Sequence, residues 1–181
     1  MPEQPAVILS PPLTLTHAMP RILTFSNTLL SLRGKIAIGD EQGRPVYEAR
    51  GEFSLLSPAW RLYRDELLVA TVRRRLLSWR PTWDVHVGTQ HCVIDRKLLA
   101  LRRVHRVHGG SHDGAMLTGN FWDMSFAITR GQQMLAKARG KLLSLRDVHT
   151  VELLGSDPAD EVFVVAAMLV VLLDRREEKR D

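Results

Sequence analysis

Nine basic residues in the middle of the chain are the group whose side chains and spacing best suit a chemical role. Guanidinium groups bind phosphate oxygens in pairs, and each cation near an anionic lipid leaflet contributes about 1 kcal/mol of attraction. The chemistry they predict is therefore recognition of an anionic, phosphate-bearing partner, and the alternative is a solvated surface charge of no specific role. The group consists of Arg73, Arg74, Arg75, Arg80, Arg96, Lys97, Arg102, Arg103 and Arg106.

The charge of the chain is unevenly distributed and agrees with this prediction. Residues 61–150 carry 16 Lys and Arg and 7 Asp and Glu, a net charge of +9. The other residues carry 9 and 13, a net charge of −4, so the whole chain has a formal charge of +5. A positive surface of this kind favours partners such as an anionic membrane, a phosphoinositide-type lipid or a nucleic acid.

A second group, in the segment "HRVHGGSHD", has the residue types of a metal site. It contains His105, His108, His112 and Asp113. On one strand His105 and His108 point to opposite faces, so both cannot ligate one ion without a bend. The segment is predicted to be a hairpin loop, and neither a metal nor a cofactor is expected.

The remaining candidates give little support to catalysis. Cys92 alternates with Ile94, which predicts a core thiol, and no G-x-S-x-G, P-loop or dinucleotide-binding pattern is present. An enzyme is therefore the least supported class. Among the aromatic residues, only Trp79 beside Arg80 has the setting of a platform on which nucleic-acid bases stack.

A phrase that recurs along the chain predicts the elements that position these groups. It appears as "TLLSLRGKIAI", "RLLSWRPTWDV", "KLLALRRVHRV" and "KLLSLRDVHTV", with weaker copies from Glu52 and Asn120. The intervals between the first large apolar residues are 24, 23, 22, 23 and 21, a period of roughly 23. These markers are Leu29, Phe53, Leu76, Leu98, Phe121 and Leu142.

Each repeat has room for two strands. Apolar and polar residues alternate within it, as where Ile36 and Ile38 flank Ala37, and turn signals such as "DEQG", "HGGSHDG" and "TRGQ" lie between the alternating runs. Six repeats therefore predict about twelve antiparallel strands, in a mainly β fold. Closure into a barrel removes exposed strand edges, but twelve strands enclose more space than wall side chains can fill.

The end of the chain supplies the missing core. Twelve consecutive apolar residues, 162–173, form about 18 Å of helix, which is too short for a bilayer core of about 30 Å. Asp157 suits the N-cap and Pro158 the first helical position. We expect a central helix over about 158–174 that fills the barrel and emerges into water at Asp174; a membrane-inserted helix is the rival interpretation.

These segments resemble the LURP-one-related family, whose members share the tubby C-terminal-like fold. The likeness runs from about Arg21 to Arg176 and is carried by "LLSLRGKIAIGDEQGRPVYEARGEFSLL", "RRRLLSWRPTWDVHV", "LTGNFWDMSFAITRGQQMLAKARGKLLSLRDVHTVEL" and the terminal apolar helix. It implies a twelve-stranded barrel around a central C-terminal helix. The wider group includes phosphoinositide-binding tubby proteins and phospholipid scramblases, but this chain lacks the Cys-rich segment and acidic Ca²⁺ loop of the scramblases.

The sequence thus predicts a single barrel domain over 21–181, after a flexible Pro-rich tail over 1–20. Its expected role is that of a non-enzymatic module that binds anionic phospholipid head groups through a basic face. A nucleic-acid-binding module and a protein-interaction module with incidental charge are the alternatives. A single cysteine and a start that has no signal-peptide pattern indicate a cytoplasmic protein, with a peripheral place at the membrane.

Overall fold

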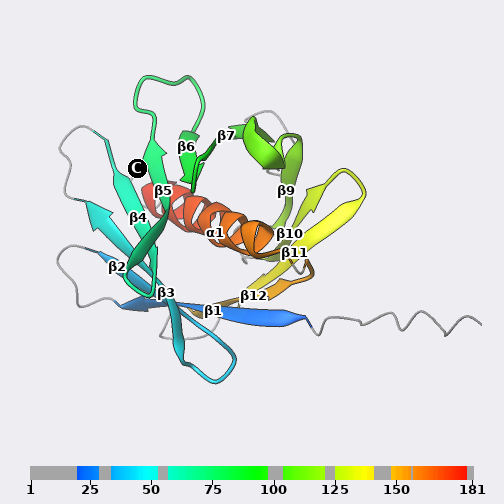
Figure 1. Ribbon diagram of the computed structural model, residues 1–181. Coiled ribbons are helices and arrows are strands. Elements are labelled where there is room, and N and C mark those ends of the chain that lie inside the picture. Colours follow the sequence, from blue (N-terminus) through cyan, green and yellow to red (C-terminus); the bar gives the residue numbers. More distant parts are fainter. Residues whose placement is uncertain are drawn as a thin grey trace, which may run out of the picture.

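The computed structural model describes residues 20–28, 34–52, 57–97, 104–120, 125–140, 148–155 and 157–178. In these residues twelve antiparallel strands close into a barrel around one long helix, which confirms the predicted fold class (Figure 1). The helix α1 spans Pro158–Glu178. The strands are β1 (Arg21–Thr28), β2 (Lys35–Gly39), β3 (Pro45–Glu52), β4 (Ala59–Arg64), β5 (Leu67–Arg74), β6 (Thr82–Val87), β7 (Gln90–Lys97), β8 (Val104–His108), β9 (Ala115–Asn120), β10 (Ser125–Arg130), β11 (Gln133–Gly140) and β12 (Val148–Leu153).

The barrel closes because β1 pairs with both β2 and β12, while every other strand pairs with its neighbours in the chain. The predicted alternation gives each strand an inner apolar face: Ile36 and Ile38 are buried in β2, and Trp60 and Leu62 are buried in β4. Of the six repeat markers, Leu76 lies between β5 and β6. The other five lie outside the described residues, as do residues 1–19 of the predicted tail.

The predicted turns connect the strands where expected. The "DEQG" segment joins β2 to β3, and the Asp40 side chain accepts hydrogen bonds from the backbone N–H groups of Gln42 and Arg44 at 3.0 and 2.9 Å. "TRGQ" joins β10 to β11, and "HGGSHDG" joins β8 to β9 through the short 3₁₀ helix η1 (Gly110–His112). These turns let consecutive strands pair as antiparallel neighbours.

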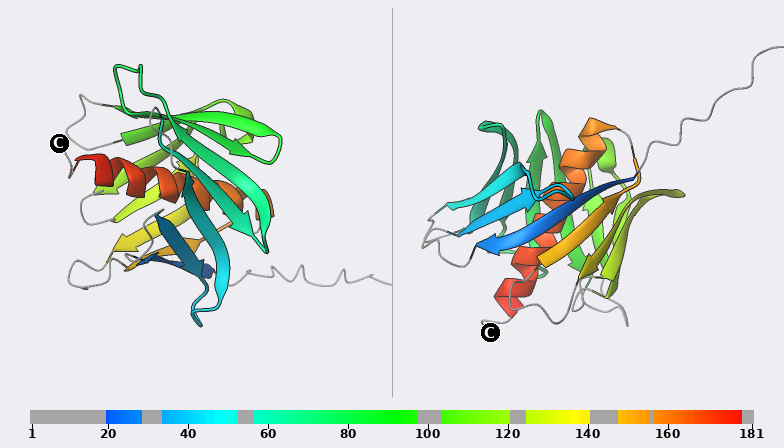
Figure 2. Two further views of the ribbon diagram at one scale, coloured as in Figure 1. Left: turned by 90° about the vertical axis from the view of Figure 1, so that its left-hand side faces the viewer. Right: turned by 90° about the horizontal axis from the view of Figure 1, so that it is seen from below.

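Helix α1 runs through the barrel and forms the centre of its core (Figure 2). Every residue from 163 to 174 is buried, as a helix that is apolar on all sides requires. Asp157 caps the start by accepting a hydrogen bond from the Ala159 N–H at 2.8 Å, as predicted. None of the helices in the described residues is long and apolar enough to cross a membrane.

The predicted end of the helix is wrong by one turn. The apolar run stops at Leu173, but Asp174 remains buried and the helix continues to Glu178. The added turn is stabilised by ion pairs between its acidic side chains and arginines of the barrel wall. Apolarity thus marks where the core ends, whereas these pairs hold the helical turn beyond it against the barrel wall.

Candidate functional site

Strands β5 to β8 lie side by side and carry most of the predicted basic group. Exposure and side-chain direction divide the described members of the group into two sets. Arg73, Arg75, Arg80, Lys97 and Arg106 are exposed and form what we call the outer basic face. Register supports this grouping, because Asp84 lies opposite Arg73, and Asp95 lies opposite both Thr82 and Arg106.

The outer basic face is only partly neutralised. Arg75 donates two hydrogen bonds to Asp84, at 2.7 and 2.6 Å, and Arg80 lies 4.0 Å from Asp95. The Arg75 hydrogen bonds and charge outweigh burial and hold the pKa of Asp84 below its usual value, so this carboxylate stays ionised.

Three cations of the face form no ion pair with a described carboxylate. Among the residues that the structure describes, no carboxylate lies within ion-pair distance of Arg73, Lys97 or Arg106. These three side chains can therefore accept an external anion without first breaking an internal pair.

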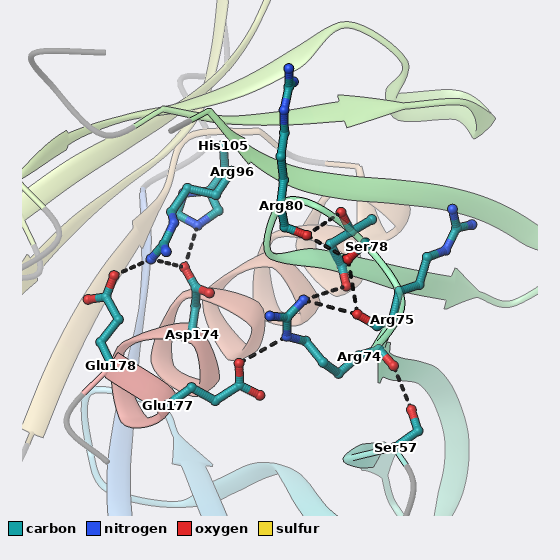
Figure 3. Close-up of polar contacts among 11 residues, drawn as sticks. Ser57, Arg74, Arg75, Ser78, Arg80, Arg96, His105, Asp174, Glu177 and Glu178 are labelled. Carbon is teal, nitrogen blue, oxygen red and sulfur yellow. Dashed lines mark hydrogen bonds and ion pairs between the residues drawn. The ribbon is translucent and has the colours of Figure 1, made fainter. Parts of the chain in front are cut away.

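Arg74 and Arg96 point the other way and do not belong to the outer face (Figure 3). Arg74 donates to Glu177 at 2.9 Å and lies over the ring of Trp83. Arg96 donates to Asp174 at 3.0 Å and also pairs with Glu178. Their side chains are only 17% and 14% exposed. Both arginines therefore hold the end of α1 inside the barrel, and the structure does not offer them to an anionic partner.

Arg102 and Arg103, the last two members of the predicted group, lie outside the described residues. The predicted group of nine thus separates into five outward side chains, two inward ones and two that the structure does not describe. Alternation along a strand accounts for the outward direction of Arg73 and the inward direction of Arg74.

The three histidines of the second group lie in different places and contact different carboxylates. His105 is buried near the C-terminal end of α1, with its Nε2 atom 3.2 Å from Asp174, whereas His108 is exposed and lies 3.4 Å from Asp95. His112 is buried near the opposite end of the helix. Within the described ranges, no cluster of three His, Cys, Asp or Glu side chains is arranged to hold a metal ion.

Sequence reasoning missed a hydrogen-bonded chain at the N-terminal end of α1. The Ser111 Oγ lies 3.1 Å from Nδ1 of His112, and the Nε2 of His112 lies 2.8 Å from Asp160. Serine proteases use the opposite orientation, with Nε2 facing the serine and Nδ1 facing the carboxylate. His112 also stacks on Phe163 with ring centroids 3.9 Å apart. This arrangement ties the β8–β9 connection to the helix.

With this geometry established, comparison with known proteins identifies the family. The model of the LURP-one-related family matches residues 21–174, which is most of the chain. The chain belongs to the LURP-one-related family. Among solved structures, an Arabidopsis thaliana protein is similar with a TM-score of 0.55 and 17% sequence identity, over 89% of this chain and 94% of that one. At that identity the likeness shows the fold alone. No curated protein matches the chain.

The only cysteine of this LURP-one-related barrel is buried in β7, as its alternation with Ile94 predicted. Burial, with a smaller effect from the charge of Asp84, raises the pKa of Cys92 to about 11. We expect its thiol to react with dithiobis(nitrobenzoate) at about pH 8 at least ~100-fold more slowly in the folded protein than in urea, because the thiolate is the reactive form. Absorbance of the released thiolate measures both rates. Equal rates would contradict the burial.

Proposed function

We propose that this protein is a non-enzymatic module that binds anionic phospholipid head groups through its outer basic face. The single observation that carries the proposal is the set of three exposed cations, Arg73, Lys97 and Arg106, without internal ion pairs among the described residues. The proposal places the protein at the periphery of a cytoplasmic leaflet, where anionic lipids concentrate.

The geometry of the face suits a surface better than a single small anion. Four neighbouring strands spaced about 4.8 Å apart spread the cations over roughly 14 Å. Several head groups can lie within that width. A phosphate ion held in one place needs converging donors, whereas a charged leaflet needs only cations on one side of the molecule.

A nucleic-acid-binding module is the second candidate, because Trp79 is fully exposed beside Arg80. An indole in this setting can stack on a base while arginines contact the phosphates. This function predicts an affinity that falls steeply with salt for single-stranded DNA or RNA. Flat binding isotherms with both nucleic acids would remove it.

Cosedimentation with vesicles tests the lipid proposal. The purified protein is mixed with phosphatidylcholine vesicles, with or without phosphatidylserine, over a series of salt concentrations. We expect binding only to the anionic vesicles, with weakening as salt rises. Changing Arg73, Lys97 and Arg106 together to Gln should weaken binding about 100-fold, since each cation contributes about 1 kcal/mol.

A matched control removes three charges from the opposite wall. Lys35, Lys137 and Arg139 are exposed on β2 and β11, away from strands β5 to β8. Their joint replacement by Gln changes the net charge equally and should leave most of the binding. Equal binding to neutral and anionic vesicles at low salt would refute the proposal, and an equal loss in both variants would show that total charge, not this face, matters.

A further inference from the structure

The β5–β6 connection, residues 75–81, carries apolar side chains that nothing in the described structure covers. Leu77 and Trp79 are fully exposed, and Leu76 is 57% exposed. The connection extends beyond the rim of the barrel at the end where the last turn of α1 lies (Figures 1 and 2). Exposed apolar groups clustered at one projecting tip are unfavourable in water and mark a contact surface.

Hydrogen bonds define the shape of this loop. Ser78 donates its hydroxyl proton to the Arg80 carbonyl at 2.6 Å, and its oxygen also lies 3.1 Å from the Arg75 carbonyl (Figure 3). The Arg75 N–H donates to the Thr82 carbonyl at 2.9 Å, which closes the base of the loop. The Ser78 hydroxyl is directed into the loop by these bonds. Its neighbours Leu77 and Trp79 therefore lie in solvent. The exposure of the two apolar side chains thus follows from bonds that the loop itself makes.

Strand β5 offers an internal comparison, because both of its ends carry exposed apolar residues. Leu67 and Leu68 lie at the other end, about 23 Å away along the strand, after the hairpin residues Asp65 and Glu66. The β5–β6 loop instead lies among the cations of the outer basic face. An anionic leaflet attracts the basic end more strongly, because the other tip carries Asp65 and Glu66 and its nearby Arg50 already pairs with Glu66. Charge therefore favours the β5–β6 loop as the apolar tip that meets the lipid.

We propose that the β5–β6 loop is a membrane-insertion loop in which Leu77 and Trp79 enter the bilayer interface while Arg73, at the end of β5, and Arg80 contact head groups. The proposal rests on the lipid-binding function proposed above and adds an orientation to it, with this rim of the barrel facing the membrane. Tryptophan favours the interface because its ring is apolar and its N–H is polar, and leucine favours the acyl region.

The lipid surface accounts for the loop better than a nucleic acid does. An exposed indole suits base stacking as well as lipid, but Leu76 and Leu77 gain nothing from contact with phosphates or base edges. Apolar side chains surrounded by arginines match a surface that is anionic outside and apolar beneath. A bilayer has that structure.

A site-specific fluorophore tests insertion directly. In a Cys92→Ala background, Leu77→Cys carries an environment-sensitive nitrobenzoxadiazole label, and Leu67→Cys carries the same label as the matched control. With phosphatidylserine-containing vesicles we expect the Leu77 label to brighten, shift to the blue and be quenched by brominated lipid. The Leu67 label should not change. Vesicle binding without any response of the Leu77 label would overturn this inference and leave the proposed function intact.

A pair of variants measures the contribution to affinity. Changing Leu77 and Trp79 to Ser should weaken binding to anionic vesicles by more than about tenfold, with most of the loss at high salt, where charge attraction is screened. Changing Leu67 and Leu68 to Ser should leave binding unchanged. If the wild-type protein fails to bind anionic vesicles, both proposals fall. A Leu77 label that responds to oligonucleotides and not to vesicles would overturn the insertion loop in favour of a nucleic-acid contact.

Discussion

Replacing Leu169 with aspartate is expected to prevent the barrel from folding. Leu169 has no solvent exposure and lies in the middle of the twelve-residue buried stretch of α1. A carboxylate there finds no partner, and burying an unpaired charge costs several kcal/mol, a large share of a total stability of about 5–15 kcal/mol. Yield of folded protein, near-ultraviolet circular dichroism and urea unfolding measure the effect.

Two further variants of the same residue show that the charge is responsible. Leu169→Met keeps the volume and should cost less than about 1.5 kcal/mol, whereas Leu169→Ala leaves a cavity and should cost about 2–5 kcal/mol. The series also tests the rival interpretation of the terminal helix. If α1 lay outside the barrel as an anchor, the aspartate variant would retain the native spectrum of the barrel.

The barrel could be predicted from the sequence because its main determinants are local. Period-two alternation marks an inner face on each strand whatever its partner, and turn signals mark where one strand ends and the next begins. The apolar run from 162 to 173 then has a single suitable place, since a helix that is apolar on every side must be enclosed. All three features are visible in a few residues at a time.

The end of the helix could not be predicted in the same way. It depends on Arg74 and Arg96, which lie 103 and 78 residues from their partners Glu177 and Asp174. Neither half of such a pair has a local signature. Alternation along β7 does place Arg96 on the inward face, with Cys92 and Ile94. An arginine at a core-facing position requires an internal carboxylate as its partner.

The sequence predicts which residues make up the outer basic face better than it predicts which of them form ion pairs. The sequence shows which residues are cationic, and parity shows which of them point outward. It does not show that Asp84 neutralises Arg75 while Arg73 keeps its charge, since only the register of β5 and β6 places Asp84 within reach. The contact between His112 and Asp160 was missed because it joins a loop and a helix that are 48 residues apart in the sequence.

One rim of the barrel therefore combines three features of different origin. Inward arginines hold the last turn of α1, three outward cations have no ion pair with a described carboxylate, and the β5–β6 loop exposes Leu77 and Trp79. Arg74 links these features, because its backbone carbonyl accepts a hydrogen bond from Ser57 at 2.5 Å while its side chain reaches Glu177 and the Arg75 carbonyl. Hydrogen bonds that hold this rim in one conformation favour insertion. A loop that becomes ordered only when it binds has a lower affinity, because ordering costs conformational entropy.

Changing Asp174 to alanine is expected to destabilise the protein by about 3 kcal/mol or more, the second large effect that the structure predicts. Asp174 is buried and contacts both His105 and Arg96. Its loss leaves a buried arginine and histidine without this carboxylate, and breaking a buried pair costs more than the pair contributes to stability. Urea unfolding gives the difference. The N-cap change Asp157→Asn is the control, since asparagine caps a helix about as well as aspartate.

The dependence on pH separates the charge of Asp174 from its volume. Burial alone would raise the pKa of Asp174, but the hydrogen bond from His105 and the charges of His105, Arg96 and Arg74 outweigh it and lower the pKa. A carboxyl whose pKa is lowered by folding stabilises the protein above its unfolded pKa of about 3.9 and loses that contribution as pH falls through the folded value. The stability difference between wild type and Asp174→Asn should therefore shrink as the pH falls below about 4. A difference that stays constant in acid would mean that the ionised carboxylate does not stabilise this end of the helix.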